Sequence, residues 1–218
     1  FIYSFLCIYL IISTFSFCLA DDYSEDNIAI DVSCEVTETI AQTTETLENS
    51  SINSRSCIVF DRNSHMTLYG KNENKKVKMA STTKIMTSII IIENCNLSET
   101  IEISKKAAGT GGSRLGLKTG DKITINDLLY GLMLCSGNDA AVALAEYAGG
   151  DIQGFADMMN KKAAELELTN THFESPHGLD SDGHYTTAYE LALLSDYALK
   201  NETFSKIVAT QNYTVTIN

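Results

Sequence analysis

Basic residues are scarce in this sequence of 218 residues. It contains 16 Lys and Arg against 28 Asp and Glu, which gives a formal net charge of −12. A protein that follows nucleic-acid phosphates needs a basic surface, so the composition excludes nucleic acid as a partner. Because 44% of the residues are hydrophobic and only 20% are charged, the chain can bury one sizeable core, and we expect one main domain.

Charge of either sign is absent from residues 1–20. This apolar and hydroxyl-rich run ends in Cys18-Leu19-Ala20. Such a run with small residues at its end is typical of a secretory signal peptide, and an uncleaved membrane anchor is the alternative. In both cases the rest of the protein is expected to be exported. Because the sequence begins at Phe1, we expect that the start of the protein is missing.

Large apolar residues are few in residues 21–54. This stretch carries nine Asp and Glu and no Lys or Arg, and Thr, Ser and Asn make up much of the remainder. A segment of this composition cannot bury enough surface to offset the entropy of ordering. The sequence therefore predicts an acidic disordered spacer before a domain that begins at residue 55.

Cysteine is present without the spacing of a metal site. Two cysteines lie in the N-terminal run, and the other four are 23, 38 and 40 residues apart, which matches no zinc pattern. These four are Cys34, Cys57, Cys95 and Cys135. Disulfides are one alternative in an exported protein, but a chain of this length does not need them as staples, so buried free thiols are favoured. We expect no metal and no cofactor.

The pattern of residues 55–218 predicts an α+β domain with a helical insertion. Alternation around turn residues predicts a β-hairpin over residues 56–69. Helices are expected over residues 80–92, 126–134, 139–148, 151–166 and 186–199. The only proline lies in a polar stretch, residues 167–185, that we expect to be an ordered loop. Residues 213–217 alternate like a strand whose partner lies beyond the end of the sequence.

The spacing of Ser81 and Lys84 would let the lysine amine reach the serine oxygen. Three residues of helix turn through about 300°, so the two side chains share one face, one turn apart. A Lys acts as a base only when it is neutral, which requires burial or a nearby cation, and the apolar flanking residues make burial plausible. The alternative is that Ser81 only caps the helix and Lys84 is solvated; the S-x-x-K spacing alone is usually coincidence.

A second pair, Ser136 and Asn138, follows 52 residues after Lys84 on a short connector between two expected helices. Alone, this pair would be an ordinary helix cap. Together with S-x-x-K it matches the signature of penicillin-binding proteins and class A β-lactamases. The combination favours catalysis over coincidence.

Three blocks, residues 79–87, 127–141 and 175–180, resemble the serine-type D-alanyl-D-alanine carboxypeptidases, the low-molecular-weight penicillin-binding proteins. They are in the family's order and spacing. The resemblance implies a β-lactamase/transpeptidase-like α+β fold, in which helices flank an antiparallel sheet beside a helical subdomain; residues 55–218 would be its N-terminal part, with an incomplete sheet. The implied roles are nucleophile for Ser81, general base for Lys84, proton relay for Ser136 and substrate-binding amide for Asn138.

The same resemblance implies the function. The protein would be a bacterial cell-wall enzyme at the outer face of the cytoplasmic membrane. It would remove the terminal D-Ala from peptidoglycan stem pentapeptides through a Ser81 acyl-enzyme, and β-lactam antibiotics would acylate it. A C-terminal region absent from this sequence would contact the membrane surface. The alternatives are a β-lactamase of the same fold and a non-catalytic wall-binding or penicillin-sensing protein.

Lys118-Thr119-Gly120 has the letters of the family's third motif but precedes Ser136, whereas the family element follows it. We therefore expect a surface turn here and the true motif beyond Asn218. The 218 residues alone are then expected to be inactive, because that strand supplies recognition of the substrate carboxylate and part of the oxyanion hole.

Two other features resemble functional sites less closely. Glu165 and Glu167 resemble the deacylating loop of class A β-lactamases, but the following Asn is one place late, so we expect the end of a helix. Histidines and acids gather near the third block without metal-binding spacing, and we expect His177 and His184 to shape the loop. The members of this group are His172, His177, Asp180, Asp182 and His184.

Overall fold

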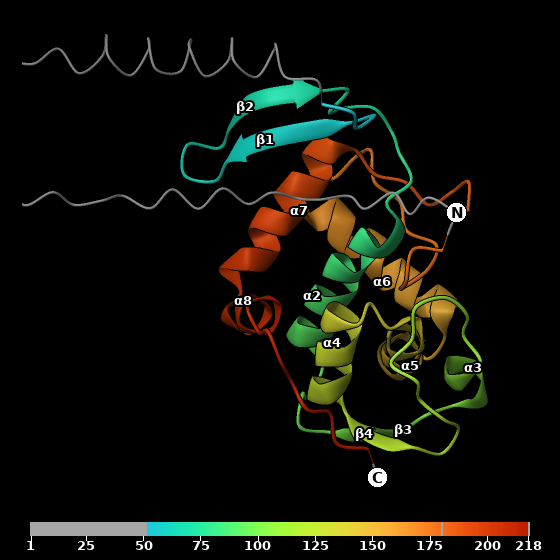
Figure 1. Ribbon diagram of the computed structural model, residues 1–218. Helices are drawn as coiled ribbons and strands as arrows, with labels where there is room; N and C mark the ends of the chain where they lie inside the picture. The colour runs from blue at the N-terminus through green and yellow to red at the C-terminus, as the bar shows by residue number, and fades with distance from the viewer. Residues whose placement is uncertain (1–51, 180, 218) are drawn as a thin grey trace, which may run out of the picture. The chain divides into compact units, whose positions relative to one another are not determined.

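The structure is a computed structural model that describes residues 52–179 and 181–217 (Figure 1). Within these residues the strands form two antiparallel pairs, β1 (Cys57–Asp61) with β2 (Met66–Lys71) and β3 (Thr100–Glu102) with β4 (Lys122–Thr124). The helices are the 3-10 helix η1 (Ala80–Thr83), α2 (Lys84–Asn94), α3 (Lys105–Ala108), α4 (Ile125–Leu134), α5 (Asn138–Gly149), α6 (Ile152–Glu165), α7 (Ala188–Lys200) and α8 (Glu202–Val208). The predicted signal peptide and all but the last three residues of the predicted spacer lie outside the described residues.

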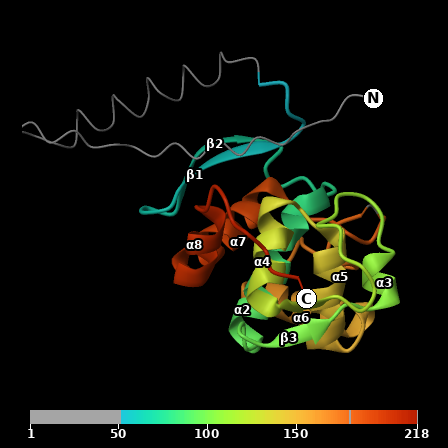
Figure 2. The same cartoon turned by 60° about the horizontal axis from the view of Figure 1, so that its bottom comes forward.

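Helix α2 is the centre of the helical part. It contacts α4, α5, α6, α7 and α8, and α4 and α5 lie side by side next to it (Figure 2). Ile89, Ile90 and Ile91 are all buried. Because β-branched residues are weak helix formers, burial against the neighbouring helices stabilises α2 more than local propensity does. Among the described residues, no helix combines the length and apolar character needed to cross a membrane.

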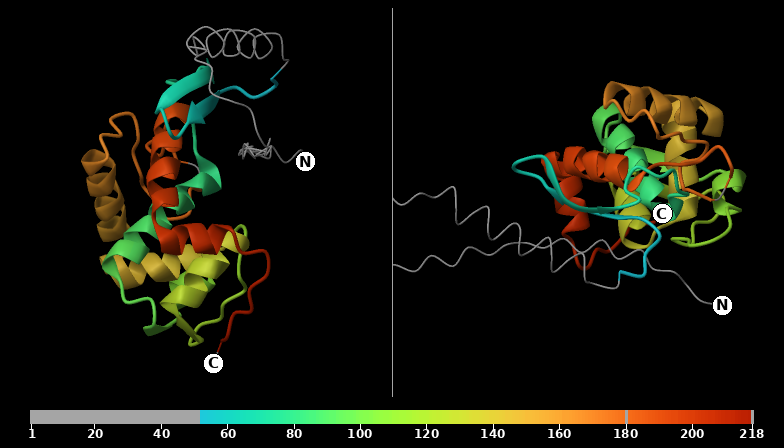
Figure 3. Two further views of the ribbon diagram at one scale, coloured as in Figure 1. Left: turned by 90° about the vertical axis from the view of Figure 1, so that its left-hand side faces the viewer. Right: turned by 90° about the horizontal axis from the view of Figure 1, so that it is seen from above.

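The predicted hairpin is confirmed. Cys57 pairs with Lys71 and Asp61 with Met66, and the register shifts between Val59 and Phe60. Strand β1 contacts α7 (Figure 3). The hairpin is thus attached to the helical part along one helix.

Several helix boundaries differ from the prediction. Helix α4 begins at Ile125, where Thr124 accepts a hydrogen bond from the Asp127 amide, and α7 begins at Ala188 after the cap Thr187. Asp151, predicted as the first residue of its helix, is instead the cap that precedes α6. The short elements α3, α8, β3 and β4 were not predicted, because three to seven residues are too few to establish a period.

The strand predicted at residues 213–217 is wrong, since no described residue after α8 belongs to a strand. Instead, the ring of Tyr213 stacks on Tyr130, with centroids 3.6 Å apart. The Tyr213 hydroxyl donates to Asp127 Oδ1 at 2.6 Å, and this hydrogen bond is the main reason that its pKa rises to about 12. The Tyr213 side chain therefore packs against α4, and the predicted strand pairing does not form in the described residues.

The cysteine prediction is partly correct. Cys57, Cys95 and Cys135 are free thiols, but Cys57 and Cys95 are only half-buried and Cys135 is exposed. The predicted burial is therefore wrong for all three of these cysteines. Cys34 lies outside the described residues.

Candidate active site

The junction of η1 and α2 brings Ser81 and Lys84 together. Ser81 is exposed, Lys84 is only 2% exposed, and Lys84 Nζ donates to Ser81 Oγ at 3.3 Å. The predicted shared face is confirmed. The alternative of a helix cap with a solvated lysine is wrong, because no side-chain capping bond forms at η1 or α2 and the lysine is buried.

Among the described residues, the Lys84 amine donates its hydrogen bonds to uncharged oxygens. Besides Ser81, Nζ donates to Asn138 Oδ1 at 2.8 Å and to the His177 carbonyl at 3.1 Å. None of the ion pairs among the described residues includes Lys84. Burial lowers the pKa of Lys84 to about 8, so a larger share of it is neutral at pH 7 than of an ordinary exposed lysine.

Asn138 opens helix α5 and is 4% exposed. Its Nδ2 donates to the Gly111 carbonyl at 2.8 Å, and its backbone N–H donates to the Ser113 carbonyl at the same distance. The amide therefore joins Lys84 to the loop before β4. The sequence predicted Asn138 at this site but not the two loop carbonyls.

Ser136 lies on the connector between α4 and α5 with φ +54°, a left-handed conformation that is uncommon for residues with a side chain. It is half-buried. Within the described part of the chain its hydroxyl forms no hydrogen bond. The structure thus brings Ser81, Lys84 and Asn138 into contact and places Ser136 two residues from Asn138 without a direct bond to the other three.

The segment after residue 174 covers the start of α2. Thr87 Oγ1 donates to the Pro176 carbonyl at 2.7 Å, next to the His177 carbonyl that accepts from Lys84. Gly178 has φ +79°, and a Cβ there would overlap the Ala80 carbonyl. Only glycine fits this contact, and sequence patterns contain no signal for it.

The two histidines hold this segment in place. The Glu174 amide donates to His184 Nδ1 at 3.0 Å, which leaves Nε2–H to donate to Thr83 Oγ1 at 2.7 Å. The Leu179 amide donates to His177 Nδ1 at 3.1 Å. Burial, and then the charge of Lys84, lowers the pKa of His177 to about 4. The expectation that both histidines shape the loop is confirmed.

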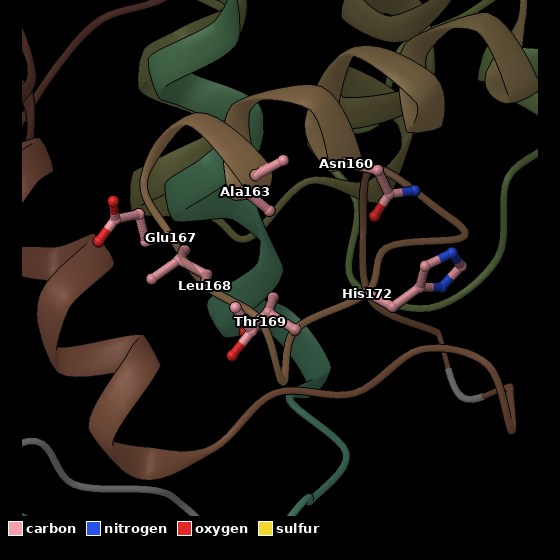
Figure 4. Close-up of a pocket in the computed structure, with 8 residues that line it drawn as sticks. Asn160, Ala163, Glu167, Leu168, Thr169 and His172 are labelled. Carbon is pink, nitrogen blue, oxygen red and sulfur yellow. The ribbon is translucent and has the colours of Figure 1, made fainter.

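The two sequence features that resembled other sites lie elsewhere. Residues 118–120 form an exposed turn, as predicted. Glu165 ends α6 and pairs with Lys162 at 3.0 Å. Glu167 lines an open pocket of about 560 Å³, with His172 toward its other end (Figure 4); none of the four predicted site residues lines it. Among the described residues, no group of three His, Cys, Asp or Glu is placed to hold a metal.

Comparison with known proteins agrees with this geometry. The family described as D-alanyl-D-alanine carboxypeptidase, peptidase S11, matches residues 41–218. The chain is 40% identical over 161 residues to the D-alanyl-D-alanine carboxypeptidase DacF of Bacillus subtilis, covering 72% of this chain and 41% of that protein. It thus spans less than half the length of this relative.

Solved structures of the same kind share the fold. The DD-transpeptidase of Streptomyces K15 has a TM-score of 0.73 and 35% identity, covering 77% of this chain and 69% of that one. Penicillin binding protein 6B from Escherichia coli has a TM-score of 0.70 and 33% identity, covering 76% and 56%. The predicted α+β fold of the penicillin-binding DD-peptidases is confirmed. The chain therefore belongs to the D-alanyl-D-alanine carboxypeptidase family.

Proposed function

We propose that the protein is a serine-type D-Ala-D-Ala carboxypeptidase that removes the terminal D-Ala from peptidoglycan stem pentapeptides. The observation that carries this proposal is the buried Lys84 amine, which lies 3.3 Å from Ser81 Oγ and has no carboxylate partner among the described residues. A lysine that only capped a helix or formed an ion pair would be solvated or would lie beside a carboxylate, and neither is true of Lys84 among the described residues.

In the proposed mechanism, neutral Lys84 takes the proton of Ser81 Oγ, and the oxygen attacks the carbonyl carbon of the penultimate D-Ala. The Ser81 amide is one donor to the resulting oxyanion. The peptide C–N bond then breaks, the proton passes through Ser136 to the amine of the departing D-Ala, and water cleaves the Ser81 ester. Asn138 orients the substrate through its amide. Ser136 must approach Lys84 on substrate binding for this relay to operate.

The remaining assignments extend the same proposal. β-Lactams acylate Ser81 because their strained amide presents the same carbonyl. The protein is exported behind the signal peptide of residues 1–20 and the spacer of residues 21–54, and acts at the cell wall on the outer face of the cytoplasmic membrane. A C-terminal region holds it at the membrane surface.

Labelling of the full-length protein with a fluorescent penicillin tests the proposal. Wild type should take one label per molecule and release D-Ala from a pentapeptide; Ser81→Ala should do neither. The matched control is Ser98→Ala, at an exposed serine, which should behave like wild type. Equal labelling of Ser81→Ala would overturn the assignment.

Two further outcomes separate the alternatives. Fast nitrocefin turnover that is lost in Glu167→Gln would favour a β-lactamase, although Glu167 lines a pocket apart from Ser81. Penicillin labelling without D-Ala release would favour a penicillin-sensing protein.

A further inference from the structure

The loop of residues 110–117, between α3 and β4, passes directly over the Asn138 amide. It contains no helix or strand, and Gly112 and Gly116 have φ +84° and +97°. A Cβ on Gly112 would lie 2.6 Å from Asn138 Nδ2. The loop therefore forms one wall of the candidate active site, and glycine makes this close approach possible.

The carboxylate of Asp139 holds the far end of this loop. Oδ1 accepts from the Leu115 amide at 2.9 Å, and Oδ2 accepts from the Gly116 and Leu117 amides at 2.8 and 3.0 Å. The Ala140 amide, in the first turn of α5, donates to Oδ1 at 2.9 Å. Three successive loop amides thus converge on one carboxylate.

Asp139 has no exposed surface, and no Lys, Arg or His forms an ion pair with it among the described residues. A buried carboxylate is tolerated only when hydrogen bonds replace its water. Here backbone N–H groups alone do so, helped by the positive end of α5. Moving the loop away would leave this charge buried with a single donor, so the loop position is strongly determined.

Asn138 holds the near end of the same loop through Gly111 and Ser113. Because Nδ2 is engaged by the Gly111 carbonyl, the other end of the amide, Oδ1, faces Lys84 Nζ. The position of the loop therefore decides how the amide presents itself to the lysine. Asn138 and Asp139, which are neighbours in the first turn of α5, thus connect the loop of residues 110–117 to the Lys84 amine.

We propose that Asp139 is a positioning residue of this site: by pinning the amides of residues 115–117, it keeps the Gly111 carbonyl against Asn138 and thereby keeps the Asn138 amide directed at Lys84. The kinetic part of this inference rests on the proposed function. The alternative is that Asp139 only stabilises the start of α5, in which case its loss would lower stability without changing the rate of acylation.

The test is Asp139→Asn in the full-length protein, because an amide keeps the shape but its NH₂ group cannot accept from a loop N–H. We expect faster hydrogen exchange in a peptide spanning residues 112–118. At saturating fluorescent penicillin, we expect the acylation rate constant to fall about 10²-fold, the effect of a misplacement near 1 Å, while labelling still reaches one per folded molecule. Loss of folded protein would lower the final labelling and leave the rate constant unchanged.

Asp127→Asn is the matched control. Asp127 is also a buried carboxylate in the first turn of a helix, but it accepts from Tyr213 and not from the loop. This variant should change stability and leave the acylation rate constant within about twofold of wild type. If Asp139→Asn does not fold, Gly116→Ala replaces it: an added Cβ there meets no atom within 4 Å, so the change strains only the backbone that binds Asp139. It should change loop exchange and rate in the same direction, more weakly.

Unchanged exchange of residues 112–118 in Asp139→Asn would overturn the proposal. So would a rate constant that falls no further than in Asp127→Asn. If wild type takes no penicillin label, the proposed function fails, whereas hydrogen exchange still decides whether Asp139 pins the loop.

Discussion

Two lysines have opposite environments: Lys84 at the start of helix α2, and Lys162 of helix α6 beside the other end of α2. Lys84 begins the helix and meets three uncharged oxygens, those of Ser81, Asn138 and His177. Lys162, on α6, reaches the other end of α2, where its Nζ lies 2.8 Å from Glu93 and 3.0 Å from Glu165. The first lysine is buried, and the second keeps 17% of its side chain exposed.

The pKa values diverge accordingly. Burial lowers the pKa of Lys84 to about 8, and its place at the positive end of the helix also disfavours a cation. The hydrogen bond to Glu93 is the main reason that the pKa of Lys162 rises above its ordinary value. The same side chain is thus prepared for proton transfer at one end of α2 and for structural pairing at the other. The difference lies in burial, which lowers the first pKa, and in the charged partners, which raise the second.

The largest expected effect comes from making Lys84 permanently charged. Lys84→Arg keeps a cation that does not lose its proton near neutral pH, so the acylation rate should fall by about 10²–10⁴-fold, the usual contribution of a general base. Stopped-flow or gel measurement of fluorescent penicillin labelling gives the rate. Lys162→Arg is the control and should acylate at the wild-type rate. Normal acylation by Lys84→Arg would show that the buried lysine is not the base.

A carboxylate beside Lys84 should make it resemble Lys162. In Asn138→Asp the new charge would lie near Nζ and raise the pKa of Lys84 by about 1–3 units. Acylation at pH 7 should then fall by about 10- to 10³-fold, and the acid limb of the pH–rate profile should move to higher pH.

The pH profile of Asn138→Asp separates charge from geometry. If the added charge is the cause, part of the lost rate returns above pH 9, where the lysine becomes neutral again. Asn138→Leu removes the same amide without adding a charge, so its lost rate should not return above pH 9. A loss of equal size at every pH in Asn138→Asp would contradict the electrostatic explanation.

The sequence predicted the residue types of this site because their relation is local or forms a motif. One helical turn joins Ser81 to Lys84, and the S-x-N pattern identifies Asn138. The Gly111, Ser113 and His177 carbonyls could not be predicted, since every residue has a carbonyl and only the fold decides where it points. The same limit applies to the contact between Gly178 and Ala80, which depends on two segments that are far apart in the sequence.

Local patterns also decide which helices and strands could be predicted from the sequence. The hairpin of β1 and β2 and the helices α2, α5 and α6 carry enough residues for a period to appear. Strands β3 and β4 have three residues each, too few for alternation. Tyr213 alternated with its neighbours but docks on Tyr130 and Asp127, so tertiary contact overrode the local pattern.

The smallest expected effect lies at the Lys162 end of α2. In Glu93→Gln the ion pair with Lys162 is lost, whereas the amide oxygen can still accept from the Tyr197 hydroxyl, 2.6 Å away in the wild type. The free energy of unfolding, measured by urea denaturation, should fall by about 1 kcal/mol, with acylation unchanged.

The pH dependence of this loss follows from the raised pKa of Lys162. A lysine whose pKa is raised on folding contributes stability that is complete below its unfolded pKa, about 10.4, and is lost only as pH rises through the folded value. The difference from wild type should therefore be constant between pH 6 and 9. Glu102→Gln, at an exposed residue that forms no ion pair with another described residue, is the control, and an equal loss in that variant would show that the ion pair between Glu93 and Lys162 contributes nothing.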